Sequence, residues 1–144
     1  MLENQTRAEM KQSARQLTSA AILVVITTAA SIVRADEIPP TNPMSGDEKA
    51  IKEGRSWYRN TCSPCHGGRA DGAGERGNAA DLRKWNKGFR KFVATVKGGK
   101  DTGRAMTMPA WGAVLDEKTI FQIGAYVETL GMEGSNWKEG VEQQ

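Results

Sequence analysis

The 144-residue chain holds two cysteines and one histidine, and these small numbers limit the metal chemistry it can support. A structural zinc site takes about four ligands, mostly from Cys and His. Three candidates fall short of that number, so zinc would need a carboxylate or a second chain to complete its coordination sphere. A single histidine also excludes any site in which two imidazoles of one chain bind the same metal ion.

Other absences narrow the fold class. No segment shows the apolar and polar alternation of a half-buried strand, and no internal repeat is present. Aromatic residues make up only 6% of the chain, and a small domain buries limited apolar surface. These shortages argue against a sheet or repeat architecture. They predict a small helical domain whose core is completed by a bound group.

The three scarce residues lie together in one pentapeptide, Cys62-Ser63-Pro64-Cys65-His66. The C-x-x-C-H spacing is typical of covalent haem c attachment, in which each thiol adds across a haem vinyl group to give a thioether. His66 then lies where its imidazole can be the proximal iron ligand. A C-x-x-C redox disulfide is an alternative, but it leaves the adjacent histidine without a role. We therefore predict Cys62 and Cys65 as the attachment sites of one haem c.

A methionine is the expected sixth ligand of the haem iron, because its soft, neutral thioether binds Fe(II) well. Four of the six methionines lie in the leader or flank the predicted helices, which leaves Met106 and Met108. Pro109 biases Met108 toward extended geometry and stiffens the loop that carries it. We predict Met108 as the ligand and keep Met106 as the alternative. Trp111 is expected either to pack on the haem, or donate to a propionate, or to lie in the core.

The first 35 residues are typical of a secretory leader. Basic residues precede an uncharged stretch over residues 20–33, and Val33-Arg34-Ala35 fits a cleavage site after Ala35. The stretch is shorter than the ~20 residues that a membrane span needs. We predict a signal peptide over residues 1–35 and a periplasmic location. Only an uncleaved leader would hold the protein at a membrane.

The rest of the chain divides into three parts by composition. They are an extended lead-in with three prolines, one helical domain and a C-terminal tail, at residues 36–45, 46–131 and 132–144. About 109 residues follow the leader, which fits one small domain. We expect a monomer whose apo form folds poorly, because a haem would supply much of its core.

Apolar spacings of three and four residues predict helices at residues 46–60, 89–97 and 117–130. A capping box from Ser45 to Glu48 begins the first helix, and Asp116 caps the last. The inward face of the first helix is expected to carry Ala50, Ile51, Gly54, Trp57 and Tyr58. Glycine inside a helix costs ~1 kcal/mol relative to alanine. Gly54 and Gly124 therefore indicate that the first and last helices cross in close contact.

Together these features resemble a class I c-type cytochrome. The resemblance covers residues 46–131, with a capped first helix, the run CSPCHG, a glycine-rich loop, a middle helix, Met108-Pro109 and a last helix ending in YVETL. It implies an all-α, small cytochrome c fold, with three or more helices wrapped around one covalently bound haem. It also implies His66 and Met108 as axial ligands and an electron carrier, not an enzyme.

A narrower resemblance concerns the stretches DGAGERG, DLRKWNKGFRKFV and MPAWG. They are similar to the cytochromes that accept electrons from PQQ-dependent methanol dehydrogenases, particularly the lanthanide-dependent type. This implies a periplasmic PQQ dehydrogenase as electron donor, with an oxidase or a second cytochrome of a respiratory chain as acceptor. One alternative is a membrane-tethered cytochrome or complex subunit that feeds a terminal oxidase. Another is a haem enzyme or sensor, which needs an open sixth position.

Positive charge gathers between residues 83 and 104, where eight Lys and Arg side chains stand against one carboxylate, Asp101. Such a run beside a haem edge would steer an acidic redox partner. The leader takes 4 of the 20 Lys and Arg residues and 2 of the 17 Asp and Glu residues, which leaves 16 against 15. This small net charge, together with export, argues against a nucleic acid partner.

Overall fold

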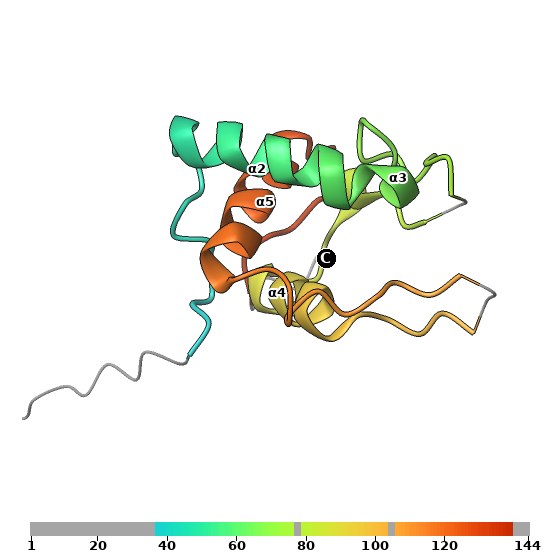
Figure 1. The fold of residues 1–144 in the computed structure, drawn as a ribbon. Coiled ribbons are helices and arrows are strands. Elements are labelled where there is room, and N and C mark those ends of the chain that lie inside the picture. The colour runs from blue at the N-terminus through green and yellow to red at the C-terminus, as the bar shows by residue number, and fades with distance from the viewer. Residues whose placement is uncertain (1–36, 77–78, 104–105, 140–144) are drawn as a thin grey trace, which may run out of the picture. The chain divides into compact units, whose positions relative to one another are not determined.

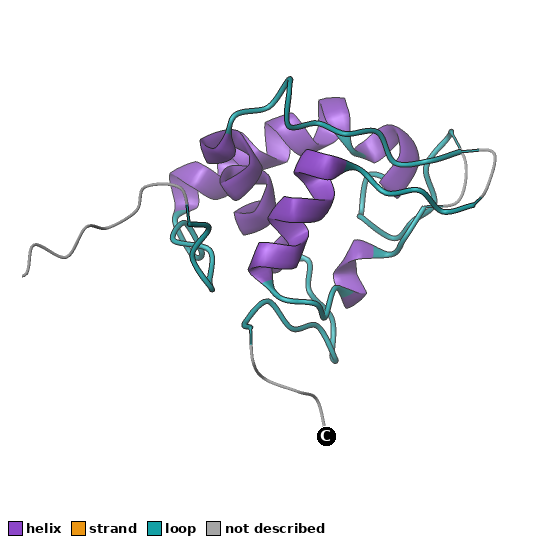
Figure 2. Ribbon diagram, turned by 90° about the horizontal axis from the view of Figure 1, so that it is seen from below, coloured by secondary structure: helices purple, strands orange, loops and turns teal. Residues whose placement is uncertain are grey.

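The computed structural model describes residues 37–76, 79–103 and 106–139. The predicted signal peptide and Arg104 of the basic run lie outside these ranges. The regular structure of the described part is helical throughout, without a strand (Figures 1 and 2). Its elements are α2 Glu48–Thr61, α3 Ser63–His66, the 3-10 turn η1 Leu82–Lys84, α4 Phe89–Gly98 and α5 Glu117–Thr129. The predicted all-α class is confirmed, and none of these helices is long and apolar enough to cross a membrane.

Helix α2 begins at a different cap from the predicted one. The carboxylate of Asp47 accepts a hydrogen bond from the backbone N–H of Ala50 at 2.9 Å, so Asp47 is the N-cap. Ser45 instead donates its hydroxyl to the carboxylate of Glu128, far along the chain. Gly46 adopts a φ of +78° between the two residues and turns the backbone there. The capping-box prediction is therefore wrong, because the chain reverses before the helix starts.

The inward face of α2 is narrower than predicted. Ala50, Gly54 and Tyr58 are buried, and Ile51 is partly buried. Trp57 was expected on the same face, but 45% of its surface is exposed. Successive helical residues are rotated by about 100°, so the neighbour of a fully buried Tyr58 lies at the edge of the packed face.

Helices α2 and α5 cross in backbone contact at Gly54. A Cβ atom on Gly54 would lie 1.8 Å from the carbonyl oxygen of Gln122 in α5, which confirms the predicted role of this glycine. Gly124 has a different role from the predicted one. A Cβ atom there would meet the rings of Phe89 and Phe92 at 3.3 Å, so this glycine makes room for α4.

Helix α5 is the centre of the core. Its residues 120–127 are all buried, a longer stretch than the predicted apolar stripe. The reason is that α2 packs on one side of α5 and α4 on another, as Figure 1 shows. Helix α4 adds its predicted apolar face, which consists of Phe89, Phe92, Val93 and Val96. Asp116 caps α5 as predicted, accepting from the N–H of Thr119 at 2.7 Å.

The two ends of the described chain meet at Arg90, in the first turn of α4. Its guanidinium donates to the backbone carbonyl of Ile38 at 2.7 Å and to the carboxylate of Glu139 at 3.1 Å. Trp137, two residues before Glu139, packs its ring 5.0 Å from that of Phe92. The last described residues therefore form part of the packed domain.

Candidate functional site

A cavity of about 990 Å³ lies between the C-terminal end of α2 with α3 on one side and α4 with the segment after it on the other. This volume is at the upper end of the ~300–1,000 Å³ typical of ligand pockets. The residues that line it are mostly apolar. All the predicted site residues are among them, namely Cys62, Cys65, His66, Met108, the alternative Met106 and Trp111.

His66 ends α3 and is held in one orientation. Only 8% of its surface is exposed, and its Nδ1 lies 2.9 Å from the backbone carbonyl oxygen of Ala80. A carbonyl can only accept, so Nδ1 carries the proton and Nε2 keeps a free lone pair, the arrangement typical of metal-binding histidines. Burial lowers the pKa of His66 and outweighs the opposing effect of the Ala80 hydrogen bond. The imidazole is therefore available in its neutral form.

The glycine-rich loop after His66 folds back against the C-x-x-C-H turn. The hydroxyl of Tyr58 donates to the carbonyl of Gly67 at 2.8 Å, which ties the loop to α2. Burial raises the pKa of Tyr58, so the hydroxyl remains a donor. A Cβ atom on Gly74 would lie 2.4 Å from the carbonyl oxygen of Pro64. Close backbone approach in this loop delivers Ala80 to the imidazole of His66.

The two cysteines are partly buried. Burial, with a smaller contribution from Cys65, raises the pKa of the Cys62 thiol to about 12. Dithiol redox chemistry uses the thiolate form, which the surroundings of Cys62 disfavour. Within the described ranges, no three Cys, His, Asp or Glu side chains gather as a metal-binding group. The site therefore suits haem attachment better than either alternative.

Residues 106–112, here called the strap, dock on the C-terminal end of α4. Met108 pairs with Lys100 through two backbone hydrogen bonds of 2.9 and 3.0 Å. The N–H of Trp111 donates to the carbonyl of Val96 at 2.9 Å, and that of Gly112 donates to the carbonyl of Lys97 at 3.1 Å. These carbonyls have no partner inside the helix. The strap satisfies them and lies across the cavity.

The two candidate methionines differ in burial. Met108 is partly buried and packs against the core, whereas 57% of the surface of Met106 is exposed. Both line the cavity. The hydroxyl of Thr102 donates to the backbone carbonyl of Met106 at 3.1 Å, a contact that involves the backbone of Met106 and not its side chain. Met108 has the better-defined environment of the two.

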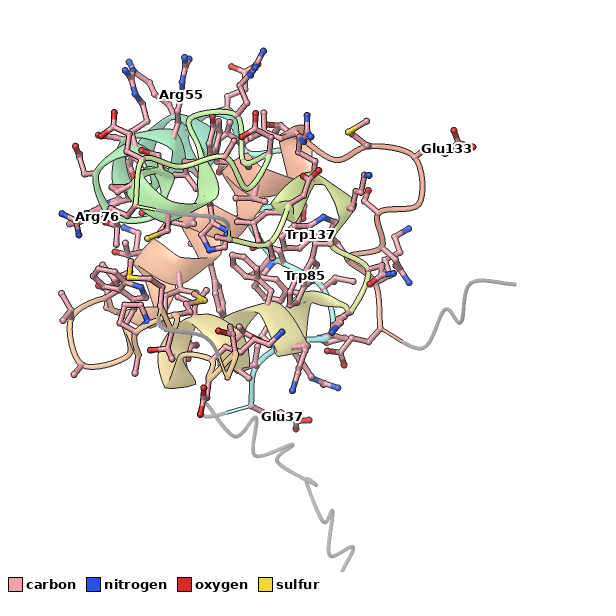
Figure 3. The ribbon with its side chains drawn as sticks, turned by 90° about the vertical axis from the view of Figure 1, so that its right-hand side faces the viewer. Glu37, Arg55, Arg76, Trp85, Glu133 and Trp137 are labelled. Atoms are coloured by element: carbon pink, nitrogen blue, oxygen red, sulfur yellow. The ribbon has the colours of Figure 1, made fainter. Side chains whose placement is uncertain are left out.

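Several lining residues were not singled out from the sequence as site residues. Trp85 and Phe92 form part of the wall, with their ring centroids 5.9 Å apart, and Trp137 packs on both from behind. Figure 3 shows Trp85 and Trp137 together in the interior, with Arg76 near the edge of the molecule. Arg76 and Lys100 place positive charge on the lining. These contacts join segments that are far apart in the sequence, so no local sequence pattern predicts them.

The basic run is partly neutralised within the domain. Three of its side chains form ion pairs at 2.8–3.1 Å, namely Arg83 with Asp81, Arg90 with Glu139, and Lys97 with Glu117. Four others are exposed and form no ion pair among the described residues: Lys84, Lys87, Lys91 and Lys100. The positive charge available to a partner is therefore smaller than the run of eight residues indicates.

Comparison with known proteins gives consistent matches. Residues 49–127 match the family described as cytochrome c oxidase, cbb3-type, subunit III. The chain is 33% identical over 100 residues to the Cbb3-type cytochrome c oxidase subunit CcoP of Azospirillum sp. (strain B510), covering 67% of this chain and 34% of the relative. It is 39% identical over 88 residues to subunit FixP of Azorhizobium caulinodans, covering 60% and 29%. The chain thus spans about a third of the length of these curated relatives.

Among solved structures, cytochrome CL from the marine methylotroph Methylophaga aminisulfidivorans is 28% identical, with a TM-score of 0.49 over 63% of this chain and 59% of that one.

A helical domain with a cavity that is lined by a C-x-x-C-H turn defines a c-type cytochrome. The chain belongs to the family of cbb3-type cytochrome c oxidase subunit III, since that family's pattern covers more than half of it. Membership implies covalently bound haem c and the role of an electron carrier, and not that of an enzyme. The residues present fit the group: two thiols and an oriented neutral imidazole lie on one wall of the cavity and a thioether on the other.

Proposed function

We propose that Cys62 and Cys65 hold the haem c through thioethers and that His66 and Met108 are its axial ligands. One observation carries the proposal: these four side chains line the same cavity although about forty residues separate Met108 from the others. The hydrogen bond from Nδ1 of His66 to Ala80 supports it further, because it leaves Nε2 as the donor atom.

The proposed electron transfer requires mainly that the protein keeps the donor atoms of His66 and Met108 in fixed positions. Haem c supplies the Fe(III)/Fe(II) couple when it is bound. Ala80 holds the imidazole of His66, and the docked strap holds Met108, so both donor atoms keep their positions as the charge changes. With His66 and Met108 both bound to the iron, no position would be left for a substrate. The mostly apolar lining would limit the access of water, and the neutral thioether of Met108 would favour the reduced state and raise the potential.

The proposed electron donor is a periplasmic PQQ-dependent alcohol or methanol dehydrogenase. Support comes from the resemblance of DGAGERG, DLRKWNKGFRKFV and MPAWG to the cytochromes that serve such enzymes. The exposed, unpaired lysines 84, 87, 91 and 100 suit an acidic docking surface, although they are fewer than the sequence run indicates. Residues 1–35 act in this proposal as a cleaved signal peptide that directs the chain to the periplasm.

The proposed acceptor is a terminal oxidase or a second cytochrome. Relatives named as subunits of cbb3-type cytochrome c oxidase favour an oxidase, and they favour a second candidate function, that of a subunit within such a complex. The mass of the mature protein separates the two candidates. A chain that begins after Ala35 supports the diffusible carrier, and a retained leader supports the tethered subunit.

The ligand assignment is tested by absorption spectroscopy on protein matured in a bacterial periplasm. We expect a c-type reduced-minus-oxidised spectrum and the weak Fe(III)–thioether charge-transfer band in the wild type. Met108→Ala should lose that band and lower the potential, and Met106→Ala, the matched control, should keep both. Loss of the band in Met106→Ala alone would move the ligand to Met106, and an unchanged Met108→Ala would refute the assignment.

The donor assignment is tested by stopped-flow reduction with a purified PQQ-dependent methanol dehydrogenase. We expect rapid reduction that slows steeply as ionic strength rises, because exposed charges are screened within about 10 Å at 0.1 M salt. The double variant Lys87→Glu/Lys91→Glu should also be slow at low salt. A wild-type protein that ascorbate reduces but the dehydrogenase does not would exclude this donor.

A further inference from the structure

Gly99 lies between the last turn of α4 and the strap, in a backbone conformation that other residues avoid. Its φ of 71° and ψ of −173° fall in a region used essentially by glycine alone. A Cβ atom on Gly99 would lie 2.6 Å from the carbonyl oxygen of Met108 and 2.8 Å from the backbone nitrogen of Ala110. Both atoms are backbone, so they could move only if the strap itself moved.

Other glycines in the chain have either the positive φ or the close contact with backbone atoms, but not both. Gly46 and Gly103 also have positive φ values, of 78° and 63°, but a Cβ atom on either would have nothing within 4 Å. Gly112 shows the reverse. Its φ is ordinary, but a Cβ atom there would lie 3.0 Å from the carbonyl oxygen of Lys97, which accepts the hydrogen bond from the N–H of Gly112. Gly99 alone among these four combines strain with direct contact to the backbone of Met108.

We propose that Gly99 is the positioning residue for Met108: the absence of its side chain lets the strap lie on the end of α4, and this keeps the sulfur of Met108 at the cavity. The proposal rests on the proposed role of Met108 as axial ligand. Any larger residue at position 99 would push the Lys100–Met108 pairing apart and withdraw the thioether. Cys62, Cys65 and His66 lie on the opposite wall and would be unaffected, so haem would stay attached.

The consequence for function is a change in the class of haem protein. With Met108 withdrawn, the sixth position becomes open to small neutral ligands of Fe(II) such as carbon monoxide. Gly99 would then decide whether this domain is a saturated electron carrier or a ligand-binding haem protein. It would do so without touching the haem.

The test compares four alanine variants of the periplasmically matured holoprotein. Gly99→Ala should lose the Fe(III)–thioether band, show a carbon monoxide shift of its reduced Soret band that the wild type lacks, and lower the potential. Gly112→Ala should show the same changes more weakly, because its contact is milder and it is free of φ strain. Gly46→Ala and Gly103→Ala should keep the band and stay unreactive to carbon monoxide, whatever their thermal stability.

Two outcomes would overturn the proposal. One is a Gly99→Ala protein that melts earlier but keeps the thioether band and ignores carbon monoxide, as expected for a purely structural glycine. The other is Gly103→Ala or Gly46→Ala losing the band to the same extent. If Gly99→Ala yields no holoprotein, the Gly112→Ala variant provides the test instead. An unaltered Fe(III)–thioether band in Gly112→Ala would then refute the proposal. Met108→Ala distinguishes a failure of the Gly99 proposal from a failure of the ligand assignment. If Met108→Ala loses the thioether band and Gly99→Ala keeps it, Met108 remains the ligand and only the role of Gly99 is refuted.

Discussion

The two walls of the cavity are built in different ways. The helical wall, residues 58–66, is almost continuous helix, and the backbone hydrogen bonds that form its helices join neighbours in the sequence. The strap is held by backbone bonds to Val96 and Lys97 of α4 and to Lys100 just after it, which precede their partners by eight to fifteen positions. The wall proposed to attach haem therefore folds locally, whereas the wall proposed to complete its coordination must be positioned by contact with another element. We expect changes in the helical wall to affect attachment and stability, and changes in the strap to affect ligation alone.

The largest effect is expected from the helical wall itself. Cys62→Ser combined with Cys65→Ser should abolish covalent haem and leave little folded protein, because both thioether sites are removed. Haem staining after denaturing electrophoresis measures this directly. Ser63→Ala, between the two cysteines, is the matched control and should retain haem, since its hydroxyl only donates to the carbonyl of Arg59. Retained covalent haem in the double variant would mean that attachment occurs elsewhere.

The next largest effect concerns the support of that wall. Gly54→Ala places a methyl group 1.8 Å from the carbonyl oxygen of Gln122 and should force α2 away from α5. We expect a loss of about 3 kcal/mol in the free energy of unfolding, at the upper end of typical overpacking costs. Denaturant unfolding of the holoprotein gives this value. Gly68→Ala, where a Cβ atom would meet nothing within 4 Å, should unfold almost as the wild type does; equal losses would remove the crossing argument.

A smaller effect tests the corrected start of α2. Asp47→Ala removes the carboxylate that accepts from Ala50 and should cost about 1 kcal/mol in unfolding free energy. Glu48→Gln, in the next position, keeps the side-chain length and removes a charge, and should cost less than about 0.5 kcal/mol. The same unfolding measurement applies. A negligible cost for Asp47→Ala would mean that the helix is capped in another way.

The smallest effect is a dependence on pH. Burial raises the pKa of Glu128, against the opposing hydrogen bonds from Ser45 and Asn42. The folded protein therefore holds this proton more tightly than the unfolded chain, and stability falls as pH rises from about 4.5 through the folded pKa. Glu128→Gln should abolish that decline in stability. The decline itself is expected to be less than about 1 kcal/mol, because the side chain is partly exposed.

Melting temperatures between about pH 4 and 8 measure this dependence. Glu133→Gln, at an exposed carboxylate beyond the end of α5, serves as the control and should leave the profile unchanged. A Glu128→Gln protein with the wild-type profile would assign the pH dependence to other groups.

Local patterns in the sequence predicted the helices well and their contacts less well. The apolar spacing located α4 and α5 to within a residue, because each helix buries apolar residues at regular spacings along its length. The cap of α2 and the partner of Gly124 were missed for one reason. Ser45 contacts Glu128, and Gly124 contacts Phe89, across turns whose direction no helical periodicity encodes.

The candidate site divides in the same way. The C-x-x-C-H motif indicated three of its residues directly, because their chemistry depends on spacing within one turn of chain. Ala80 was not predictable as the partner of His66, since a loop of glycines sets where it returns. The end of the middle helix was predicted to within one residue, but the position of the strap on that helix end depends on tertiary contact.

Arg90 has a consequence for how the domain can be joined to other polypeptides. Its guanidinium contacts Ile38 and Glu139 together, so the two ends of the described chain leave from one point, at the first turn of α4. The strap docks at Val96 and Lys97 in the last turn of that helix, roughly 10 Å away at a rise of about 1.5 Å per residue. Sequence fused at either end of the described chain would therefore join the domain at the first turn of α4, away from the strap that lines the cavity.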